Sequence, residues 1–376
     1  MFVRTIQSKV ESWINKGKVV IIYGARQTGK TTMVESILEN TNKLSCKYID
    51  CDLIDNKLTL QSQNKELLQQ FLGKNKLVVI DEAQRVENIG LNLKIIHKYL
   101  PDIQIIATGS SSFDLSNKIN EPLTGRNVEF TLYPLSVQEI SQKFDIVQIQ
   151  SQLMNILRYG MYPDIFGRSE DQIEKLLNKI SNDYLYKDLM EYSEVRKSDT
   201  IYKFLQVLAF CIGSELSYTE LGAKVGINKN TAEKYLDLLE KCFVIKIVRP
   251  FKKNLIKEIT KPFKVYFWDI GVRNSIIQAF KPLELRDDIG KLWENFCVME
   301  RVKLNNNADK VVQYYFWRTT DQKEIDLIEA ENLELRAFEF KWSDTKTVKP
   351  PTDFIEAYPN TSFEVINNKN WWKFLI

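Results

Sequence analysis

The sequence predicts an α/β fold that opens with a parallel sheet covered by helices on both faces. A β-branched apolar run, 19–23, precedes a glycine loop and a helix-forming segment. A second apolar run, 77–80, ends in two acids, and further apolar runs alternate with helical segments up to residue 132. Alternation of strands with helices is typical of parallel sheets with helices on both sides.

The glycine loop carries the pattern G-x-x-x-x-G-K-T. It consists of Gly24, Ala25, Arg26, Gln27, Thr28, Gly29, Lys30 and Thr31, with Thr32 continuing into the helix. Inward-turned backbone N–H groups and a helix N-terminus favour phosphate at such a loop. We expect Lys30 to reach the β- and γ-phosphates and the Thr31 hydroxyl to hold Mg²⁺. The alternative is a glycine turn with a chance lysine.

The two acids that end the run at 77–80 have the position of a Walker B motif. At the carboxyl end of its strand, Asp81 is placed to hold Mg²⁺ through water. Glu82 is then placed to polarise an attacking water. Two acids at a strand end are common in isolation, and the alternative is a solvated strand terminus. Here they follow the glycine loop, which has the pattern of a phosphate-binding P-loop, by about fifty residues. At that spacing the two acids indicate nucleotide chemistry.

Two further polar positions are candidates for sensing the nucleotide. The strand predicted at 103–107 ends in hydroxyl residues, of which Ser110 and then Thr108 are the candidates for contacting the γ-phosphate or its water. A helix cap is the equal alternative. Arg126 precedes the strand predicted at 128–132. It is a candidate for stabilising the transferring phosphoryl group, in cis or from a neighbouring subunit, and otherwise a surface residue of a turn.

Composition excludes several other classes of protein. The chain has 376 residues, 44% of them hydrophobic, and a formal net charge of +3, which neither requires nor excludes nucleic acid. Its five cysteines form no C-x-x-C pair, so we expect no zinc site and a reducing cytoplasm. The start of the chain lacks the apolar run of a signal peptide, and no run approaches the ~20 residues of a membrane helix.

Residues 200–250 have the pattern of a winged helix. The third predicted helix, 230–242, has the position of a recognition helix, but its lysines are balanced by acids. The segment after it is more basic, which makes residues 228–264 a candidate surface for double-stranded DNA. Its basic residues are Lys246, Arg249, Lys252, Lys253, Lys257, Lys261 and Lys264, against Glu258. DNA binding and a module for domain contacts are equally supported by the sequence.

Taken together, the motifs resemble those of prokaryotic AAA-like ATPases that join an N-terminal P-loop domain to a C-terminal domain of uncharacterised function. The resemblance covers almost the whole chain and rests on 23–32, 80–84, 108–111 and 123–126, with further landmarks at 159–163 and 186–188. Met161 departs from the small or aliphatic residue expected there. The resemblance implies an AAA/ASCE-type sheet, then a winged helix and a domain similar to restriction-endonuclease-like nucleases. It also makes Arg126 a stronger candidate for an arginine finger than its spacing alone does.

With the resemblance, the chain is expected to have four parts. These are a P-loop ATPase domain at 1–136, a helical lid at 137–198, a winged helix at 199–258 and a nuclease-like α/β domain at 259–376. The expected cofactors are ATP and Mg²⁺, with slow hydrolysis. The resemblance and the lack of an N-K-x-D motif after the fourth strand favour ATP over GTP. The sequence leaves three functions open: an enzyme that acts on DNA, a nucleotide-operated switch, and a regulator of signalling or defence. It also leaves open whether the chain forms a homo-oligomer.

The C-terminal part carries a possible second site. Asp326 lies on one predicted strand, and Glu339 and Lys341 lie two apart on the next, which places them on one face. Glu294 lies on the helix before both strands. An acid followed by E-x-K is the pattern of the restriction-endonuclease-like core, where two carboxylates hold Mg²⁺ and the lysine stabilises the attacking water or the phosphate. A salt-bridge cluster without catalysis is the alternative.

Overall fold

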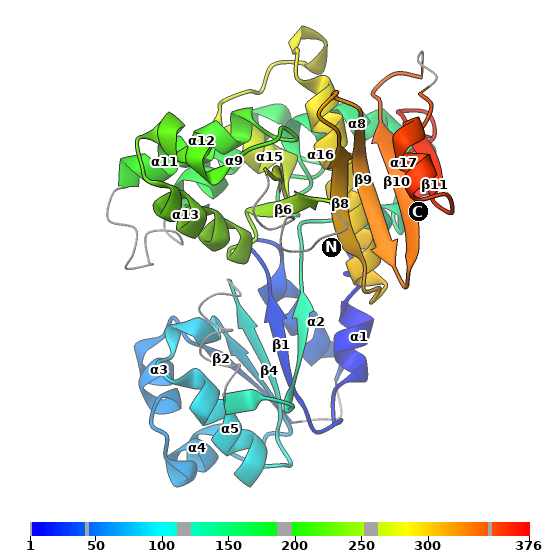
Figure 1. Ribbon diagram of the computed structural model, residues 1–376. Coiled ribbons are helices and arrows are strands. Elements are labelled where there is room, and N and C mark those ends of the chain that lie inside the picture. The colour runs from blue at the N-terminus through cyan, green and yellow to red at the C-terminus, as the bar shows by residue number, and fades with distance from the viewer. Residues whose placement is uncertain (1, 42–44, 111–121, 186–197, 252–261, 345–347) are drawn as a thin grey trace. The chain divides into compact units, whose positions relative to one another are not determined.

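The structure is a computed structural model, shown in Figure 1. It describes residues 2–41, 45–110, 122–185, 198–251, 262–344 and 348–376. The described chain folds into two compact units. The first consists of Met1–Tyr133 with Lys241–Phe243, and the second of Pro134–Glu240 with Val244–Ile376. The predicted landmark at 186–188 and Ser111 lie outside the described residues.

The first unit alternates strands with helices. Its elements are α1 (Gln7–Ser12), β1 (Val19–Tyr23), α2 (Lys30–Asn40), β2 (Cys46–Asp50), α3 (Ile54–Leu60), α4 (Lys65–Leu72), β3 (Leu77–Asp81), η1 (Ala83–Arg85), α5 (Ile89–Tyr99), β4 (Gln104–Gly109) and β5 (Asn127–Thr131). The first helix, α1, is short. Asn15 and Gly17 have positive φ angles of 61° and 67°, which right-handed helices exclude, so α1 ends before them.

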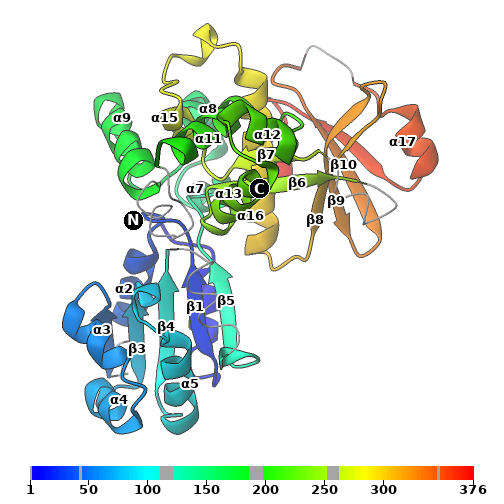
Figure 2. The ribbon, with the colours of Figure 1, turned by 60° about the vertical axis from the view of Figure 1, so that its left-hand side comes forward.

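Within the described residues, the strands of this unit form a parallel sheet in the order β2-β3-β4-β1-β5. Figure 2 shows β3, β4, β1 and β5 of this sheet side by side. The predicted parallel α/β fold is confirmed. In this order β4 stands between the strand before the glycine loop and the strand that ends in Asp81. Because all neighbours are parallel, the carboxyl ends of β1, β3 and β4 meet at one edge of the sheet.

Two apolar layers cover the faces of this sheet. Alternate residues of β1 point to opposite sides, as the pleat of a strand requires. Ile21 packs in a cluster with side chains of α3, α4 and α5, whereas Val20 and Ile22 pack with α1 and α2. Both clusters are buried. The glycine loop and the acids at the sheet edge therefore rest on strands fixed from both sides.

The second unit begins with helices. Its first elements are α7 (Val137–Ser141), α8 (Ile146–Tyr159), α9 (Glu170–Lys179), η2 (Ile180–Leu185), α11 (Ser198–Phe210), α12 (Tyr218–Val225) and α13 (Lys229–Lys241). The remaining elements are β6 (Ile245–Pro250), β7 (Lys264–Phe267), α15 (Ile270–Ile276), η3 (Leu283–Leu285), α16 (Ile289–Asn307), β8 (Gln313–Arg318), β9 (Glu324–Glu331), β10 (Glu334–Phe340), α17 (Thr352–Ala357), β11 (Ser362–Ile366) and α18 (Trp372–Leu375).

The described strands of the second unit form a mixed sheet in the order β11-β10-β9-β8-β6-β7. Figure 1 shows β8, β9 and β10 side by side, with α17 next to β10 and β11. The pairs β8–β9 and β9–β10 are antiparallel, whereas β10 and β11 are parallel and joined through α17. At the other end, β6 and β7 form an antiparallel pair after the three helices α11, α12 and α13.

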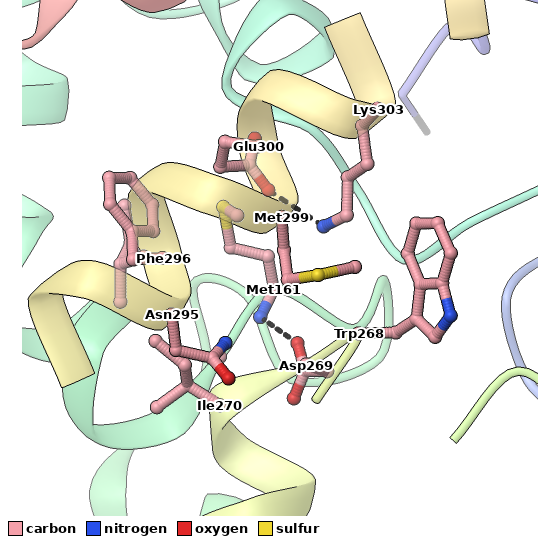
Figure 3. Close-up of a pocket in the computed structure, with 11 residues that line it drawn as sticks. Met161, Trp268, Asp269, Ile270, Asn295, Phe296, Met299, Glu300 and Lys303 are labelled. Atoms are coloured by element: carbon pink, nitrogen blue, oxygen red, sulfur yellow. Dashed lines mark hydrogen bonds and ion pairs between the residues drawn. The ribbon is translucent and has the colours of Figure 1, made fainter. Parts of the chain in front are cut away.

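The turn after α8 is fixed by a buried carboxylate. Asp269 Oδ2 accepts a hydrogen bond from the Met161 amide at 2.7 Å, and Oδ1 accepts one from the Val272 amide at 3.0 Å. Asp269 and Met161 both line a cavity of about 10 Å³, which is enough for about one water. Figure 3 shows Asp269 facing Met161 there. Gly160 has a φ of 75°, and a Cβ there would overlap Asp269 Oδ1. The predicted landmark at 159–163 is thus a packed junction.

Candidate functional site

The glycine loop between β1 and α2 has the backbone shape of an anion cradle. Gly24, Gln27 and Gly29 all have positive φ angles, and α2 begins directly after Gly29. A Cβ at Gly24 would overlap the Leu132 carbonyl oxygen, so the loop requires glycine there. The first N–H groups of α2 have no partner within the helix, and they carry its positive partial charge.

Lys30 is buried at the start of α2 and lies against the loop. Its Nζ donates to the Gly24 carbonyl at 2.8 Å and to the Ala25 carbonyl at 3.0 Å. The ammonium is therefore held over the concave side of the loop, which is the position from which it can contact phosphate oxygens. The predicted role of Lys30 is compatible with this geometry.

Asp81 is bonded by hydroxyl groups from three elements. Its Oδ2 accepts from Thr31 at 2.8 Å and from Tyr48 at 2.5 Å. Its Oδ1 accepts from Thr108. Burial, and next the hydrogen bond to Asp81, raises the pKa of the Tyr48 hydroxyl, so this group stays protonated at neutral pH. A carboxylate beside a threonine hydroxyl is the oxygen donor set that Mg²⁺ prefers, so these residues fit the expected ion.

Glu82 lies at the strand end in a strained backbone conformation, with a φ of 52°. Its side chain accepts a hydrogen bond from Gln84 Nε2 at 2.5 Å, and the same nitrogen lies 3.0 Å from Ser110 Oγ. Gln84 thus joins the predicted base to the first sensor candidate. Thr108, the second candidate, contacts Asp81 and the Glu82 amide instead.

Arg126 lies at the opposite edge of the sheet from the glycine loop. It precedes β5, where Asn127 pairs with Val19 at the amino end of β1. The loop follows the carboxyl end of β1, roughly 15 Å away at the rise of a strand. Arg126 is exposed, and its guanidinium donates to the Thr124 carbonyl at 3.2 Å. The fold therefore does not bring Arg126 to the loop of its own chain.

Several contacts at the site were not predicted. Arg4 donates to the Thr28 carbonyl at 2.5 Å and to the Tyr133 carbonyl at 2.6 Å, which braces the loop from outside the motif. Tyr48 and Gln84 were also missed as site residues. Their roles depend on which strands become neighbours. No local pattern in the sequence indicates that.

The predicted DNA surface of the second unit is less basic than the sequence suggested. On α13, Lys229 and Lys234 are exposed beside the equally exposed Glu233 and Asp237. Lys264 is 1% exposed and cannot contact a DNA backbone, which corrects its place in the basic segment. Among the remaining wing positions, Lys252, Lys253, Lys257, Glu258 and Lys261 lie outside the described residues.

The structure brings the predicted C-terminal acids into one buried cluster. Asp326 of β9 accepts from the Phe340 amide at 2.9 Å, and Glu339 of β10 pairs with Lys341 at 2.6 Å. Burial, and next the Glu294 charge, raises the pKa of Asp326 to about 7. Burial, and next the Asp326 charge, raises the pKa of Glu339 to about 7.

An unpredicted lysine lies among these acids. Lys264 of β7 places its Nζ 2.9 Å from Glu294 Oε1 and 3.7 Å from Asp326 Oδ1. The same nitrogen lies 2.6 Å from Glu324 Oε1. In the part of the chain that the structure describes, no group of three or more His, Cys, Asp or Glu side chains is arranged to hold a metal ion. With an ammonium between the carboxylates, these residues do not fit the expected Mg²⁺.

Three family models match successive parts of the chain. Residues 16–141 match an AAA domain. Residues 150–283 and 289–370 match two domains of unknown function, DUF8612 and DUF4143. Together with the sheet and the glycine loop, the first match makes the N-terminal unit an AAA-type P-loop domain, a nucleotide-binding fold.

Similar proteins of known sequence are themselves uncharacterized. One from Mycobacterium tuberculosis is 25% identical over 348 residues, which cover 92% of this chain and 75% of that protein. One from Methanocaldococcus jannaschii is 26% identical over 315 residues, which cover 72% of this chain and 65% of that protein.

Among solved structures, a Pif1 helicase from Candida albicans aligns with 16% identity and a TM-score of 0.27 over 48% of each chain. A Drosophila ORC structure bound to DNA aligns with 13% identity and a TM-score of 0.26 over 70% of this chain and 90% of that chain.

Among the helices that the structure describes, none combines the length and the apolar character needed to cross a membrane.

Proposed function

We propose that the N-terminal unit binds ATP with Mg²⁺ and hydrolyses it slowly. The observation that carries this proposal is the 2.8 Å contact between the Thr31 hydroxyl and the Asp81 carboxylate. It supports the proposal because both groups are oxygen donors of the kind that Mg²⁺ binds, and Thr31 lies in the first turn of a helix whose N-terminus favours phosphate. ATP is favoured over GTP by the family resemblance and by the missing N-K-x-D motif.

Each residue of the site has one task in this proposal. The loop amides and Lys30 bind the phosphates, and Thr31 and Asp81 hold the ion. Mg²⁺, when bound, neutralises charge on the phosphates. Glu82 orients and deprotonates the attacking water, and Ser110 contacts the γ-phosphate or that water. Gln84 holds Glu82 in position through its bond to the carboxylate.

The first test removes the ammonium. We expect Lys30→Ala to lower ATP affinity by about tenfold or more, because a charge-assisted contact to phosphate is lost. Isothermal titration with Mg²⁺–ATP measures this change. Lys18→Ala is the matched control, since Lys18 lies just before β1 at the opposite edge of the same sheet. Unchanged affinity in Lys30→Ala would contradict the proposed site.

Arg126 remains a candidate only for action in trans. We propose that it would reach the nucleotide of a second copy in a homo-oligomer, since its own loop lies at the other edge of the sheet. The measurement is ATP turnover per chain as a function of protein concentration. A rate per chain that rises with concentration would support the proposal. A concentration-independent rate would exclude it.

A second candidate function is coupling of the nucleotide state to DNA. The helices α11, α12 and α13, followed by the antiparallel β6–β7 pair, support the winged-helix interpretation, in which α13 contacts the major groove. The order α16-β8-β9-β10-α17-β11 supports the nuclease-like interpretation of the C-terminal part. The four predicted parts are retained in this proposal, with the β6–β7 pair crossing the boundary predicted between 258 and 259.

ATP turnover with and without duplex DNA separates the alternatives. Stimulation by DNA would favour an enzyme that acts on DNA. Salt-sensitive binding without stimulation would favour a nucleotide-operated switch. The absence of binding at low salt would contradict both and leave a regulator with a protein partner. A plasmid incubated with Mg²⁺ or Mn²⁺, with and without ATP, tests the ATP-regulated endonuclease. Cleavage lost in Asp326→Ala and Lys341→Ala would support that alternative.

A further inference from the structure

The acid cluster of the second unit surrounds a lysine that has no access to solvent. Lys264 is 1% exposed, and its Nζ lies within 4 Å of carboxylates from α16 and β9. Glu294 also accepts from the Tyr266 hydroxyl at 2.7 Å. A buried ammonium is strongly unfavourable unless anions and hydrogen bonds compensate it, and here the carboxylates provide both.

The ammonium lies among carboxylate oxygens of the kind that bind a divalent cation. Glu294, Glu324 and Asp326 each direct an oxygen at Lys264 Nζ, at 2.9, 2.6 and 3.7 Å. A second cation at this position would lie within a few ångströms of a positive charge in a buried environment, where repulsion is strong. The lysine and a metal ion therefore exclude each other.

Other charges next to the cluster already have partners. Lys341 pairs with Glu339 at 2.6 Å. From β8, Arg318 lies 3.9 Å from Glu324 Oε2 and 3.6 Å from Glu215 Oε2. These cations, together with Lys264, balance most of the negative charge of the acids. The cluster is thus largely neutralised by the protein's own side chains.

We infer that Lys264 Nζ is the resident cation of this cluster, in the place that a catalytic metal would take, so that the unit does not cleave a phosphodiester. The inference rests on the proposed nuclease-like interpretation of the unit. It is independent of ATP hydrolysis, because the test below counts metal ions in the absence of nucleotide. Failure of the ATPase proposal would leave it unchanged.

The experiment exchanges the ammonium for an uncharged side chain of similar length. Mn²⁺ bound to the nucleotide-free full chain is counted by electron paramagnetic resonance in the wild type and in Lys264→Met. We expect one additional Mn²⁺ per chain in Lys264→Met. Adding Asp326→Asn to this variant should remove the additional ion, because a ligand oxygen loses its charge.

Lys303→Met is the matched control. Lys303 is also 1% exposed, and within 4 Å it pairs with one carboxylate, that of Glu300 at 2.7 Å, and donates to the Leu135 carbonyl. Asp269 and Glu139 lie near this pair, but their carboxylates accept hydrogen bonds from backbone amides. Figure 3 shows this pair beside the small cavity. One carboxylate does not make a divalent site of the kind expected here, so Lys303→Met should bind no additional Mn²⁺.

Two results would overturn the inference. One is a wild-type chain that binds Mn²⁺ at this cluster, shown by loss of that ion in Asp326→Asn. The other is a folded Lys264→Met chain with no additional ion. Should Lys264→Met be unfolded without metal, near-UV circular dichroism replaces the count. Mn²⁺ must then restore the native signal, since a ligand that binds the folded state stabilises it. A signal that Mn²⁺ does not restore would equally overturn the inference.

Discussion

Replacing Glu82 by glutamine is expected to lower ATP turnover by about 100-fold or more, while the affinity for Mg²⁺–ATP stays within a factor of about two. Glutamine keeps the size of the side chain but cannot accept the proton of the attacking water. The ligands of phosphate and metal, Lys30, Thr31 and Asp81, are untouched by the change. Single-turnover hydrolysis and isothermal titration measure the two quantities separately.

The control for this change is Glu87→Gln. Glu87 lies on the same connection between β3 and α5 but is exposed, so its neutralisation should leave turnover unchanged. Wild-type turnover in Glu82→Gln would remove Glu82 from the role of base. Loss of ATP binding in that variant would also count against the assignment, because the role of Glu82 lies in the chemical step alone.

Replacing Gly160 by alanine is expected to destabilise the second unit by about 3 kcal/mol or more. The new methyl group would have to displace Asp269, whose carboxylate is buried and bonded to the Met161 and Val272 amides. Amides left without a partner in the interior each cost about 1–3 kcal/mol. The left-handed backbone adds about 1 kcal/mol for any residue with a Cβ. Urea unfolding followed by fluorescence measures the loss.

Gly167→Ala separates the backbone effect from the packing effect. Gly167 has a φ of 84°, similar to the 75° of Gly160, but a Cβ there would meet no atom within 4 Å. This variant should therefore show only the strain of about 1 kcal/mol. Equal losses in the two variants would show that the contact with Asp269 contributes nothing.

Much of the first unit could be predicted because its signals are local. The runs at β1, β3 and β4 are buried on both faces, so they are continuous apolar segments that stand out from the helices. The phosphate loop and the acids at 81 and 82 follow these strands directly. Their meeting at one edge follows from the parallel arrangement alone.

Contacts between distant segments could not be predicted in this way. Tyr48 reaches Asp81 because β2 pairs with β3, and Arg4 reaches Thr28 from a segment before the first strand. The strand β11 was also missed. Its sequence is short, and four of its five residues are exposed or half-exposed, so it lacks a continuous apolar run. Its pairing with β10 depends on the path of α17.

The assignment of Lys264 to the basic segment was wrong. Its neighbours along the chain are basic, so it was assigned to a DNA-contacting segment. Yet all four residues of β7 are buried, Lys264 included. A lysine in a buried strand requires partners from other elements. The apolar and aromatic residues that follow Lys264 were the signal in the sequence that could have distinguished this lysine from the exposed ones.

The bond from Arg4 to Thr28 has a thermodynamic consequence for ligand entry. The backbone of the glycine loop and the Lys30 side chain are already held by hydrogen bonds within the protein. When a phosphate binds, the loop backbone and the Lys30 side chain exchange protein partners for phosphate oxygens. These groups lost their conformational freedom when the chain folded, so binding costs little further entropy. The entropic penalty of association is smaller for such a preorganised cradle. Cutting this brace by Arg4→Met should therefore slow capture of nucleotide and speed its release, leaving the phosphate ligands themselves intact.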